Sequence, residues 1–277
     1  MSEDRYCVIG NPVEHSRSPW IHARFAEQTG QPVAYGRRLA PLDGFAATVR
    51  QFRAEGGLGC NITVPFKFEA AALADALSAR ARQAGACNTL RFDGGQVFGD
   101  NTDGAGLVGD IRAAGVELAG RDLLLVGAGG AAAGVLGPLL DARPRRVVIA
   151  NRTPAKAQAL VDGHATIAQG AELLACGLDD IAGAFDIVVN ATASSLAGGS
   201  VPVPGRVLRP GALAYDMMYG PAAEGFLAWA RAHGGIARDG LGMLVEQAAA
   251  SFFVWRGVRP DTAPVLAGLR ALLSAGG

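Results

Sequence analysis

The sequence has no excess of charge of either sign. Lys plus Arg and Asp plus Glu each number 25 among the 277 residues, and charged residues make up only 18% of the chain. A protein that binds nucleic acid needs surplus positive charge to neutralise the phosphate backbone. We therefore expect no nucleic-acid partner and instead a small-molecule ligand.

Cysteine and histidine are scarce, and neither forms a recognisable cluster. The four cysteines (Cys7, Cys60, Cys87 and Cys176) make no C-x-x-C pair, and the four histidines show no ligand spacing. Metal sites and disulfide frameworks are both recognised by such spacings. We therefore expect neither a metal ion nor a disulfide bond.

The sequence also lacks a long hydrophobic run. The first residues, Met1 to Arg5, are polar and charged. The apolar stretches after them are shorter than a membrane span or the apolar region of a signal peptide. We therefore expect a cytoplasmic protein with no membrane partner.

Hydrophobic residues are abundant and form half of the chain, together with 39 glycines. Apolar segments of strand length alternate with Ala/Leu-rich segments of helix length from one end to the other, which is typical of α/β layers. The length suits two domains of about 100 to 200 residues each, and one large domain is the alternative. The sequence therefore predicts two α/β domains.

The first domain is expected over residues 1–103. Its predicted strands are Tyr6 to Gly10, Val33 to Leu39 and Gly59 to Val64, and Leu90 to Phe98 is predicted as a hairpin. Helices are expected after Pro19 and after Asp43.

The second domain is expected over residues 104–238, with a Rossmann-type sheet. It opens with the apolar strand Asp122 to Val126, followed by an Ala-rich helix. Its further predicted strands are Arg146 to Ala150, Ile187 to Asn190 and Ala212 to Asp216. Leu241 to Arg256 and Ala263 to Leu273 have apolar residues at helical spacing. We expect these helices, within residues 239–277, to return to the first domain and complete it.

A glycine-rich turn follows the first strand of the second domain. The pattern Gly127-x-Gly129-x-x-Ala132 matches the dinucleotide fingerprint, whose glycines let the backbone approach a pyrophosphate at a helix N-terminus. Taken alone, the pattern also fits a plain strand-to-helix turn. The candidate phosphate-binding residues are Gly127, Ala128, Gly129, Gly130 and Ala131.

The end of the next strand indicates which dinucleotide is bound. An NAD-binding protein places an acidic residue there to hold the ribose diol, whereas this chain has Asn151-Arg152-Thr153. A guanidinium can bind a 2′-phosphate through two hydrogen bonds, and a carboxylate would repel it. We therefore predict NADP, bound by Asn151, Arg152 and Thr153. Lys156 is a further candidate, although it fits an exposed lysine on a helix equally well.

Thr192 follows another strand end, at Asn190-Ala191. The nicotinamide half of the cofactor would cross the carboxyl edge of the sheet at this point. Thr192 is therefore a cofactor-binding candidate, and the alternative interpretation is a capping turn.

Three polar clusters in the first domain follow or flank apolar segments. Ser16 and Ser18 precede Pro19, and two hydroxyls beside the free N–H groups of a helix N-terminus suit a carboxylate ligand. By propensity alone, Ser18 fits a simple N-cap. The other clusters contain Lys67, after the predicted strand over 59–64, and Asn88 with Asp103. A lone lysine is normally solvated, and Asp103 also fits a helix cap.

Taken together and in order, these segments resemble the signatures of the shikimate dehydrogenase family along nearly the whole chain. The matching stretches are Gly10-Asn11-Pro12 through Pro19, Asn61 to Lys67, Ala86 to Thr89, Gly99 to Gly104, Gly127 to Ala131, Asn151 to Thr153, Tyr215 to Tyr219, and Asp239 to Ala248. The chain departs from the family pattern at Ala193 and Ser195, which puts the shape of the loop after Thr192 in question, and also at Glu224.

The resemblance implies an NADP-dependent enzyme that interconverts 3-dehydroshikimate and shikimate in the route to chorismate and the aromatic amino acids, as a monomer or homodimer. It implies that Lys67 and Asp103 form the catalytic pair. It implies that the substrate is bound by Ser16, Ser18, Thr63, Lys67, Asn88, Asp103, Tyr219 and Gln247. It also adds three residues to the nicotinamide side of the cofactor site, Met217, Gly240 and Met243.

Two other functions are compatible with the same fold. A quinate or dual quinate/shikimate dehydrogenase differs in its substrate, and Ser18 and Arg152 argue against it. A non-catalytic NADP-binding sensor would not need both Lys67 and Asp103. The sequence alone leaves two roles open for Lys67. It either transfers the proton itself, or it orients the substrate while water relays the proton.

Overall fold

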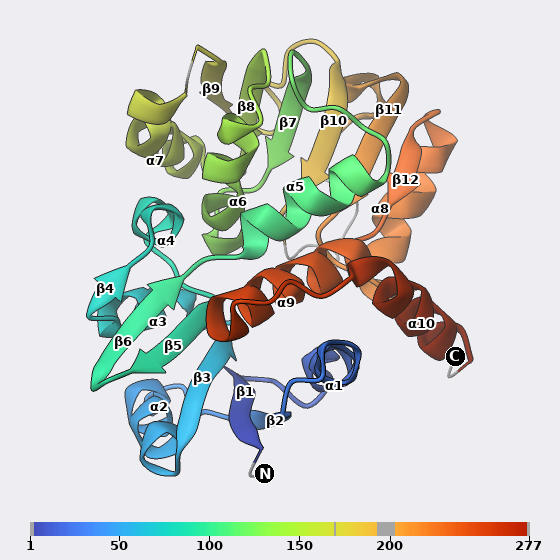
Figure 1. Cartoon of the computed structure of the whole chain (residues 1–277). Helices are drawn as coiled ribbons and strands as arrows, with labels where there is room; N and C mark the ends of the chain where they lie inside the picture. Colours follow the sequence, from blue (N-terminus) through green and yellow to red (C-terminus); the bar gives the residue numbers. More distant parts are fainter. Residues whose placement is uncertain (1–2, 169, 193–202, 276–277) are drawn as a thin grey trace. The chain divides into compact units, whose positions relative to one another are not determined.

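The computed structural model describes residues 3–168, 170–192 and 203–275. It divides into two compact units, Met1–Gly106 with Val245–Gly277 (unit 1) and Leu107–Leu244 (unit 2) (Figure 1). Among the described residues, no helix is long and apolar enough to cross a membrane. The predicted fold class, two α/β domains with C-terminal helices that return to the first, is confirmed.

Unit 1 is built on a six-stranded mixed sheet. Its strands and helices are β1 (Asp4–Gly10), α1 (Ser18–Thr29), β2 (Val33–Leu39), α2 (Phe45–Ala54), β3 (Gly57–Ile62), α3 (Lys67–Leu73), β4 (Ala76–Leu77), α4 (Ala79–Ala84), β5 (Thr89–Asp93), β6 (Gln96–Asp100) and α10 (Thr262–Ala275). The strand order is β2-β1-β3-β5-β6-β4, with β1 parallel to β2 and β3, and β5 antiparallel to β3 and β6.

The two faces of this sheet are covered differently. On one face, α2 and α3 contribute Phe45, Phe52 and Phe66 to an apolar core. On the other face, helix α9 (Leu241–Arg256) brings Trp255 to within stacking distance of Tyr6, with ring centroids 4.6 Å apart. Successive residues of a strand point to opposite faces, so β3 places Cys60 and Ile62 in the first core and Asn61 toward α9.

Unit 2 is built on a six-stranded parallel sheet. Its elements are the continuation of α5 (Asp103–Ala113), then β7 (Asp122–Val126), α6 (Gly130–Asp141), β8 (Arg146–Ala150), α7 (Pro154–His164), β9 (Glu172–Cys176), β10 (Phe185–Asn190), β11 (Leu208–Asp216), α8 (Pro221–Ala232) and β12 (Ile236–Arg238), with 3₁₀ turns at Ala165–Ile167 and Gly205–Val207. The order β12-β11-β10-β7-β8-β9 is that of a dinucleotide-binding sheet.

Apolar side chains fill both faces of the unit 2 sheet. Leu123 and Leu125 of β7 pack with α5, α6 and α7, whereas Leu124 and Val126 pack with α8. A parallel strand that is buried on both faces reads as a continuous apolar run, which is why Asp122 to Val126 was recognisable in the sequence. Because all six strands are parallel, their carboxyl ends lie along one edge of the sheet. The turns at this edge can carry polar residues.

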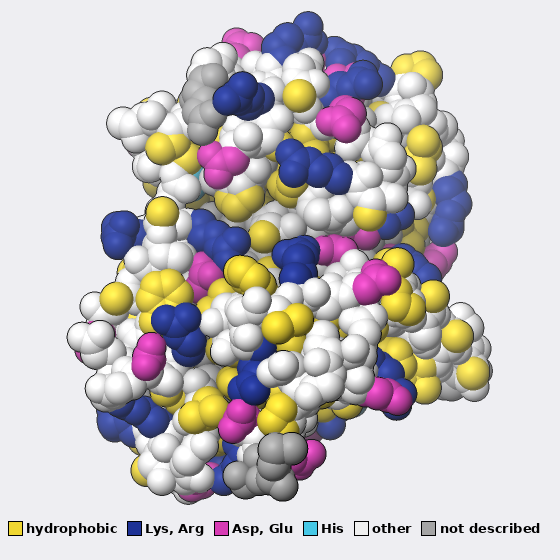
Figure 2. Space-filling view, viewed as in Figure 1, with side chains coloured by type: hydrophobic (Ala, Val, Ile, Leu, Met, Phe, Trp, Pro, Cys, Tyr) yellow, Lys and Arg dark blue, Asp and Glu magenta, His cyan; other side chains and the backbone are white. Residues whose placement is uncertain are grey.

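The opposite, amino edge of the unit 2 sheet is held by an arginine–aspartate cluster. Figure 2 shows Lys and Arg side chains gathered at this end of unit 2. Asp122 accepts hydrogen bonds from Arg145 (2.8 and 2.6 Å), Arg209 (2.7 Å) and Arg146 (3.2 Å). The Arg145 guanidinium lowers the pKa of Asp122 below its usual value. The guanidinium groups are engaged by carboxylates, so this cluster stabilises the fold.

Three strands of the described residues escaped the sequence prediction, and one predicted strand was displaced by two residues along the chain. The unpredicted strands are β4, β9 and β12, which lie at the edges of their sheets. The strand predicted over Gly59–Val64 ends at Ile62, because the Phe66 N–H bonds the Thr63 carbonyl (3.1 Å) and turns the chain.

Candidate active site

The glycine-rich turn between β7 and α6 is shaped for close approach of a ligand. Gly127 has a φ of 109°, and a Cβ at this position would lie 3.1 Å from the Ala191 carbonyl oxygen. Gly129 is the N-cap of α6, whose first helical residue is Gly130, and no side chain caps this helix end. The turn therefore offers uncapped helix N–H groups and the positive end of the helix dipole to an anion.

This turn also lies at the switch point of the sheet. From β7, the chain continues to β8 and β9 on one side and to β10, β11 and β12 on the other. In open parallel sheets, ligands bind outside the carboxyl ends of the strands where the order reverses. The position of the turn and its backbone geometry thus point to the same site.

Arg152 lies at the carboxyl end of β8, beside that turn. Its side chain is exposed, and it makes no hydrogen bond or ion pair with the residues that the structure describes. The neighbouring Asn151 amide donates to the Thr153 carbonyl (2.9 Å), which orders the loop. Lys156 is exposed on the first turn of α7. The two cations are therefore available to a bound phosphate.

Polar side chains at the ends of β10 and β11 are linked to one another by hydrogen bonds. The Asn190 amide donates to the buried Asp216 carboxylate (2.9 Å), and the Thr192 hydroxyl donates to Asn190 Oδ1 (2.7 Å). The Thr192 side chain thus serves a local turn, as the capping interpretation proposed. Its backbone nevertheless lines the carboxyl edge of the sheet.

Gly240 lies directly on the backbone of Met217. A Cβ at Gly240 would be 2.3 Å from the Met217 carbonyl oxygen, so only glycine fits without movement of the chain. Met217 packs against the apolar core that contains the buried Met243. The structure therefore brings together the three residues predicted on the nicotinamide side, while the predicted substrate residue Tyr219 follows Met217 in the same unit.

An ion pair between the buried Asp110 and the partly buried Arg238 holds the segments around Gly240 in place. Asp110 accepts hydrogen bonds from Tyr215 Oη (2.7 Å) and from Arg238 (2.8 and 2.6 Å). Burial raises the pKa of Tyr215 well above its usual value, which keeps this phenol a hydrogen-bond donor. Gly242 packs on the Asp110 carboxylate, where a Cβ would lie 1.8 Å from Oδ1. Neither Asp110 nor Arg238 was predicted from the sequence to have a role.

In unit 1, Lys67 and Asp103 form an ion pair of 2.6 Å between Nζ and Oδ2. The Lys67 side chain is 21% exposed and that of Asp103 is 8% exposed, so the pair is shielded but reachable. Asp103 is the first residue of α5, and its own N–H bonds Asn101 Oδ1 (3.1 Å). Its two carboxylate oxygens are therefore engaged by side chains of unit 1, and it does not act only as a helix cap.

Asn88 holds the second oxygen of Asp103. Its Nδ2 donates to Asp103 Oδ1 (2.8 Å), to Thr102 Oγ1 (2.9 Å) and to Gln247 Oε1 (3.2 Å). Four residues predicted to bind substrate are therefore connected by hydrogen bonds, namely Lys67, Asn88, Asp103 and Gln247. Thr63 precedes the turn that leads into α3, whose first residue is Lys67.

Ser16 and Ser18 form a pair of hydroxyls at the start of α1. Their oxygen atoms are 3.2 Å apart, and Ser16 Oγ accepts the Ser18 N–H (3.3 Å). The interpretation of Ser18 as N-cap is wrong, because α1 begins at Ser18 and the N-cap residue is Arg17. Both hydroxyls instead stand at a helix N-terminus, as a carboxylate site requires.

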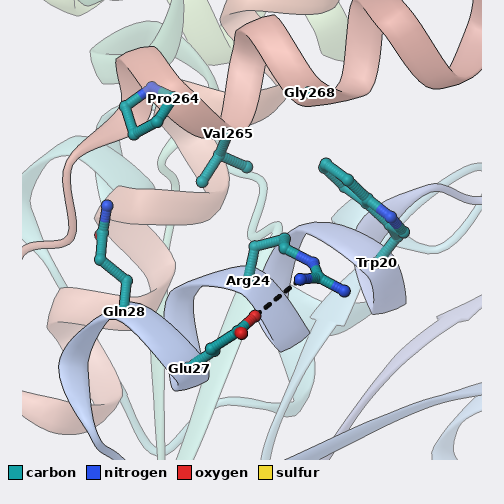
Figure 3. A pocket seen from close by; sticks show the side chains of 7 residues that line it. All are labelled: Trp20, Arg24, Glu27, Gln28, Pro264, Val265 and Gly268. Carbon is teal, nitrogen blue, oxygen red and sulfur yellow. Dashed lines mark hydrogen bonds and ion pairs between the residues drawn. The ribbon is translucent and has the colours of Figure 1, made fainter.

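A separate pocket of about 420 Å³ lies between α1 and α10 (Figure 3). Its lining residues are Trp20, Arg24, Glu27, Gln28, Pro264, Val265 and Gly268. Within it, the Arg24 guanidinium lies over the Trp20 ring and pairs with Glu27 (2.7 Å). None of the predicted site residues lines this pocket, since it uses the face of α1 opposite to Ser18.

His22 lies on the buried face of α1, among aromatic rings. It stacks on Tyr35 with ring centroids 4.1 Å apart, and neither ring nitrogen has a hydrogen-bond partner among the described residues. Burial lowers the pKa of His22 to about 3, against an opposing effect of Asn61. His22 is therefore neutral in the folded protein at neutral pH.

We predict that His22 makes the protein acid-sensitive. The pKa of histidine is 6.5 in the unfolded chain and about 3 for His22 in the folded protein. Between these two pH values the unfolded state binds one more proton than the folded state. The free energy of unfolding therefore falls as the pH falls through this range. One proton corresponds to about 1.4 kcal/mol per pH unit. His22→Phe keeps the ring and should flatten urea-unfolding free energies measured from pH 7 to pH 5. An unchanged slope would contradict the prediction.

Two of the three departures from the family pattern, Ala193 and Ser195, lie outside the described residues. The third, Glu224, is exposed in the first turn of α8 and pairs with Arg231 (3.2 Å). In the described part of the chain, no three His, Cys, Asp or Glu side chains group as a metal site, and the four cysteines are free.

A parallel sheet of this order, with a glycine turn at its switch point, defines a dinucleotide-binding protein of the Rossmann type, here joined to a second α/β unit. Family models match most of the chain. They are the shikimate dehydrogenase substrate binding domain (residues 8–90), shikimate / quinate 5-dehydrogenase (residues 111–197) and the shikimate 5′-dehydrogenase C-terminal domain (residues 240–270). The chain belongs to the shikimate dehydrogenase family.

Individual relatives agree with the family models. A shikimate dehydrogenase (NADP(+)) of Acidovorax sp. (strain JS42) is 67% identical over 99% of this chain and 98% of its own. The crystal structure of an Ael1 enzyme from Pseudomonas putida has a TM-score of 0.90 at 47% identity, covering 96% of this chain and 98% of its own. Shikimate 5-dehydrogenase from Thermus thermophilus, in complex with NADP(H) and shikimate, has a TM-score of 0.85 at 33% identity, covering 97% of this chain and 99% of its own.

Proposed function

We propose that this protein is an NADP-dependent shikimate dehydrogenase that reversibly reduces 3-dehydroshikimate to shikimate, in the route to chorismate and the aromatic amino acids. Two relatives that are 67% identical over nearly their full length bear that name. The observation that carries the proposal is the Lys67–Asp103 pair at 2.6 Å, held by Asn88. A cation fixed beside a hydrogen-bonding carboxylate is what a ketone oxygen needs as it becomes an alkoxide.

Unit 2 is the proposed cofactor unit. The uncapped N-terminus of α6 and the turn over Gly127 to Ala131 would hold the pyrophosphate. Arg152 would hold the 2′-phosphate with Asn151, Thr153 and Lys156, and the carboxyl edge at Thr192, Met217, Gly240 and Met243 would border the nicotinamide. When bound, NADPH supplies the hydride for the reduction.

Unit 1 is the proposed substrate unit. Ser16 and Ser18 would bind the carboxylate of the substrate, because their hydroxyls stand together at the start of α1. Thr63, Asn88, Asp103 and Gln247 would bind the ring hydroxyls, and Tyr219 is a further proposed substrate residue. Each hydrogen bond from Ser16 or Ser18 to the charged carboxylate of the substrate is worth about 1.5 to 3 kcal/mol.

Lys67 and Asp103 divide the chemistry between them. Lys67 Nζ donates a hydrogen bond to the oxygen that becomes an alkoxide, and its positive charge stabilises the negative charge that develops there. Asp103 orients Nζ and accepts a hydrogen bond from a neighbouring hydroxyl of the substrate. Asn88 keeps one oxygen of Asp103 fixed, so that the other can serve Lys67.

The proposed activity is tested by the absorbance of NADPH. We expect 3-dehydroshikimate to be reduced with NADPH, and in the reverse direction shikimate to be oxidised much faster than quinate. A cytoplasmic monomer or homodimer is proposed as the working form. Comparable rates with shikimate and quinate would favour a dual dehydrogenase, and binding of NADPH without turnover of either substrate would favour a non-catalytic sensor.

A further inference from the structure

We infer that Thr89 and Ser251 are positioning residues for the Lys67–Asp103 pair. Neither hydroxyl contacts Lys67 or Asp103 directly, and both residues are fully buried. Their hydroxyls set the orientation of the Asn88 amide, and this amide in turn holds Asp103. The inference rests on the proposed function, because it assigns Asp103 and Lys67 to the reaction.

The Asn88 amide has only one favourable orientation. Its Oδ1 accepts the backbone N–H of Thr102 (2.8 Å), and its Nδ2 donates to Asp103 Oδ1 (2.8 Å). A backbone N–H can only donate and an ionised carboxylate can only accept. A rotated amide would therefore place its oxygen against the carboxylate and its NH₂ group against the N–H of Thr102.

Thr89 reinforces this orientation from the side. Its hydroxyl donates to Asn88 Oδ1 (2.9 Å), the same oxygen that accepts the Thr102 N–H. Thr89 Oγ1 accepts a hydrogen bond from Asn61 Nδ2 (3.1 Å), and Ser251 Oγ lies 2.7 Å from it. Ser251 comes from α9, so the orientation of Asn88 depends on a helix far away in the sequence.

Asn61 fixes the direction of the hydrogen bonds at the other end. It pairs with Thr89 across β3 and β5, and its Nδ2 donates to the Asn88 carbonyl (3.1 Å) and to Ser251 Oγ (2.9 Å). A carbonyl only accepts, so the Asn61 amide cannot be reversed, and Tyr35 Oη donates to its Oδ1 (2.7 Å). Ser251 Oγ thus accepts from Asn61, and it donates to the Gln247 backbone carbonyl one turn earlier in α9 (3.0 Å).

The result is a continuous buried network of hydrogen bonds. It runs from Asn61 to Ser251, Thr89 and Asn88, and it ends on Asp103. Buried hydrogen bonds of this kind polarise one another, and a missing member leaves its neighbours unsatisfied in a medium of low dielectric. Loss of either hydroxyl therefore loosens the Asn88 amide. This amide holds Oδ1 of Asp103 and leaves Oδ2 to pair with Lys67.

The test is a set of variants assayed with shikimate and NADP. Thr89→Val and Ser251→Ala each remove one hydroxyl, and we expect kcat to fall roughly fivefold to tenfold, the value of about one net hydrogen bond. Thr89→Ser restores the hydroxyl and should recover most of the activity. Thr48→Val is the matched control, since the Thr48 hydroxyl bonds the Gly44 carbonyl on α2 and takes no part in the network.

A double-mutant cycle separates positioning from a general loss of stability. In an Asp103→Asn background the carboxylate is gone, so Thr89→Val should lower kcat little further, whereas simple destabilisation would reduce activity by the same factor in both backgrounds. Wild-type kcat in both Thr89→Val and Ser251→Ala, or a full loss in the Asp103→Asn background, overturns the inference while the proposed function stands. A wild-type protein without activity on shikimate overturns both.

Discussion

Replacing Lys67 with alanine should lower kcat by about 100-fold or more, with little change in the KM for shikimate. The charge of Nζ matters most when the substrate oxygen becomes an alkoxide, so its loss raises the barrier more than it weakens binding. Steady-state assays on protein shown by circular dichroism to be folded provide the measurement. A Lys67→Ala protein with near-normal kcat would show that this lysine has no catalytic role.

The partner carboxylate should respond differently. Asp103→Asn removes an acceptor for a substrate hydroxyl and also the charge that orients Lys67 Nζ at 2.6 Å, so both KM and kcat should suffer. Residues that act as a unit are not additive, and the double variant should be only slightly worse than the poorer single variant. Fully multiplicative losses would indicate that the two residues act independently.

The second large effect is expected at the cofactor site. Arg152→Ala should raise the KM for NADP roughly tenfold to a hundredfold, which corresponds to the loss of a charge-assisted interaction of about 1.5 to 3 kcal/mol. The KM for NAD should change far less, because NAD lacks the 2′-phosphate. This expectation follows from the exposed guanidinium at the end of β8, which is not engaged by another described side chain.

Lys156→Ala is the matched control for that experiment. Lys156 is also a cation near the end of β8, but it lies on the first turn of α7 and interacts with a phosphate mainly as a point charge. We expect a smaller effect than that of Arg152→Ala. Equal losses with NADP and NAD in the Arg152 variant would mean that this residue supports the fold and does not recognise the phosphate.

The sequence predicted the elements with the strongest apolar patterns. Asp122 to Val126 and Leu241 to Arg256 have the same bounds in the structure as in the prediction. A doubly buried strand is a short continuous apolar run, and an apolar-rich stretch of 16 residues is long enough to favour a helix. Strand β9 escaped prediction because Glu172 opens it and its residues are only partly buried at the sheet edge. Strand β12 is three residues long, too short for any periodicity.

The site was predictable where residues cluster in the sequence and unpredictable where they meet only in space. Lys67 and Asp103 are 36 positions apart, and no periodicity joins them. Their pairing was inferred from the resemblance alone. Ser251 is a single hydroxyl in an apolar helix, where it looks like any tolerated serine. Its contacts with Asn61 and Thr89 depend on the packing of α9 against the β3–β5 pair.

The order in which the chain is synthesised bears on when this site can form. Unit 2 is one continuous segment, whereas unit 1 is interrupted and needs the stretch after Val245 to be complete. Domains generally fold as units while the ribosome is still translating. The cofactor unit can therefore fold before synthesis ends, but the hydrogen bonds from Gln247 and Ser251 to Asn88 and Thr89 can form only once α9 has emerged. A nascent chain can thus acquire its nucleotide-binding fold before its catalytic geometry.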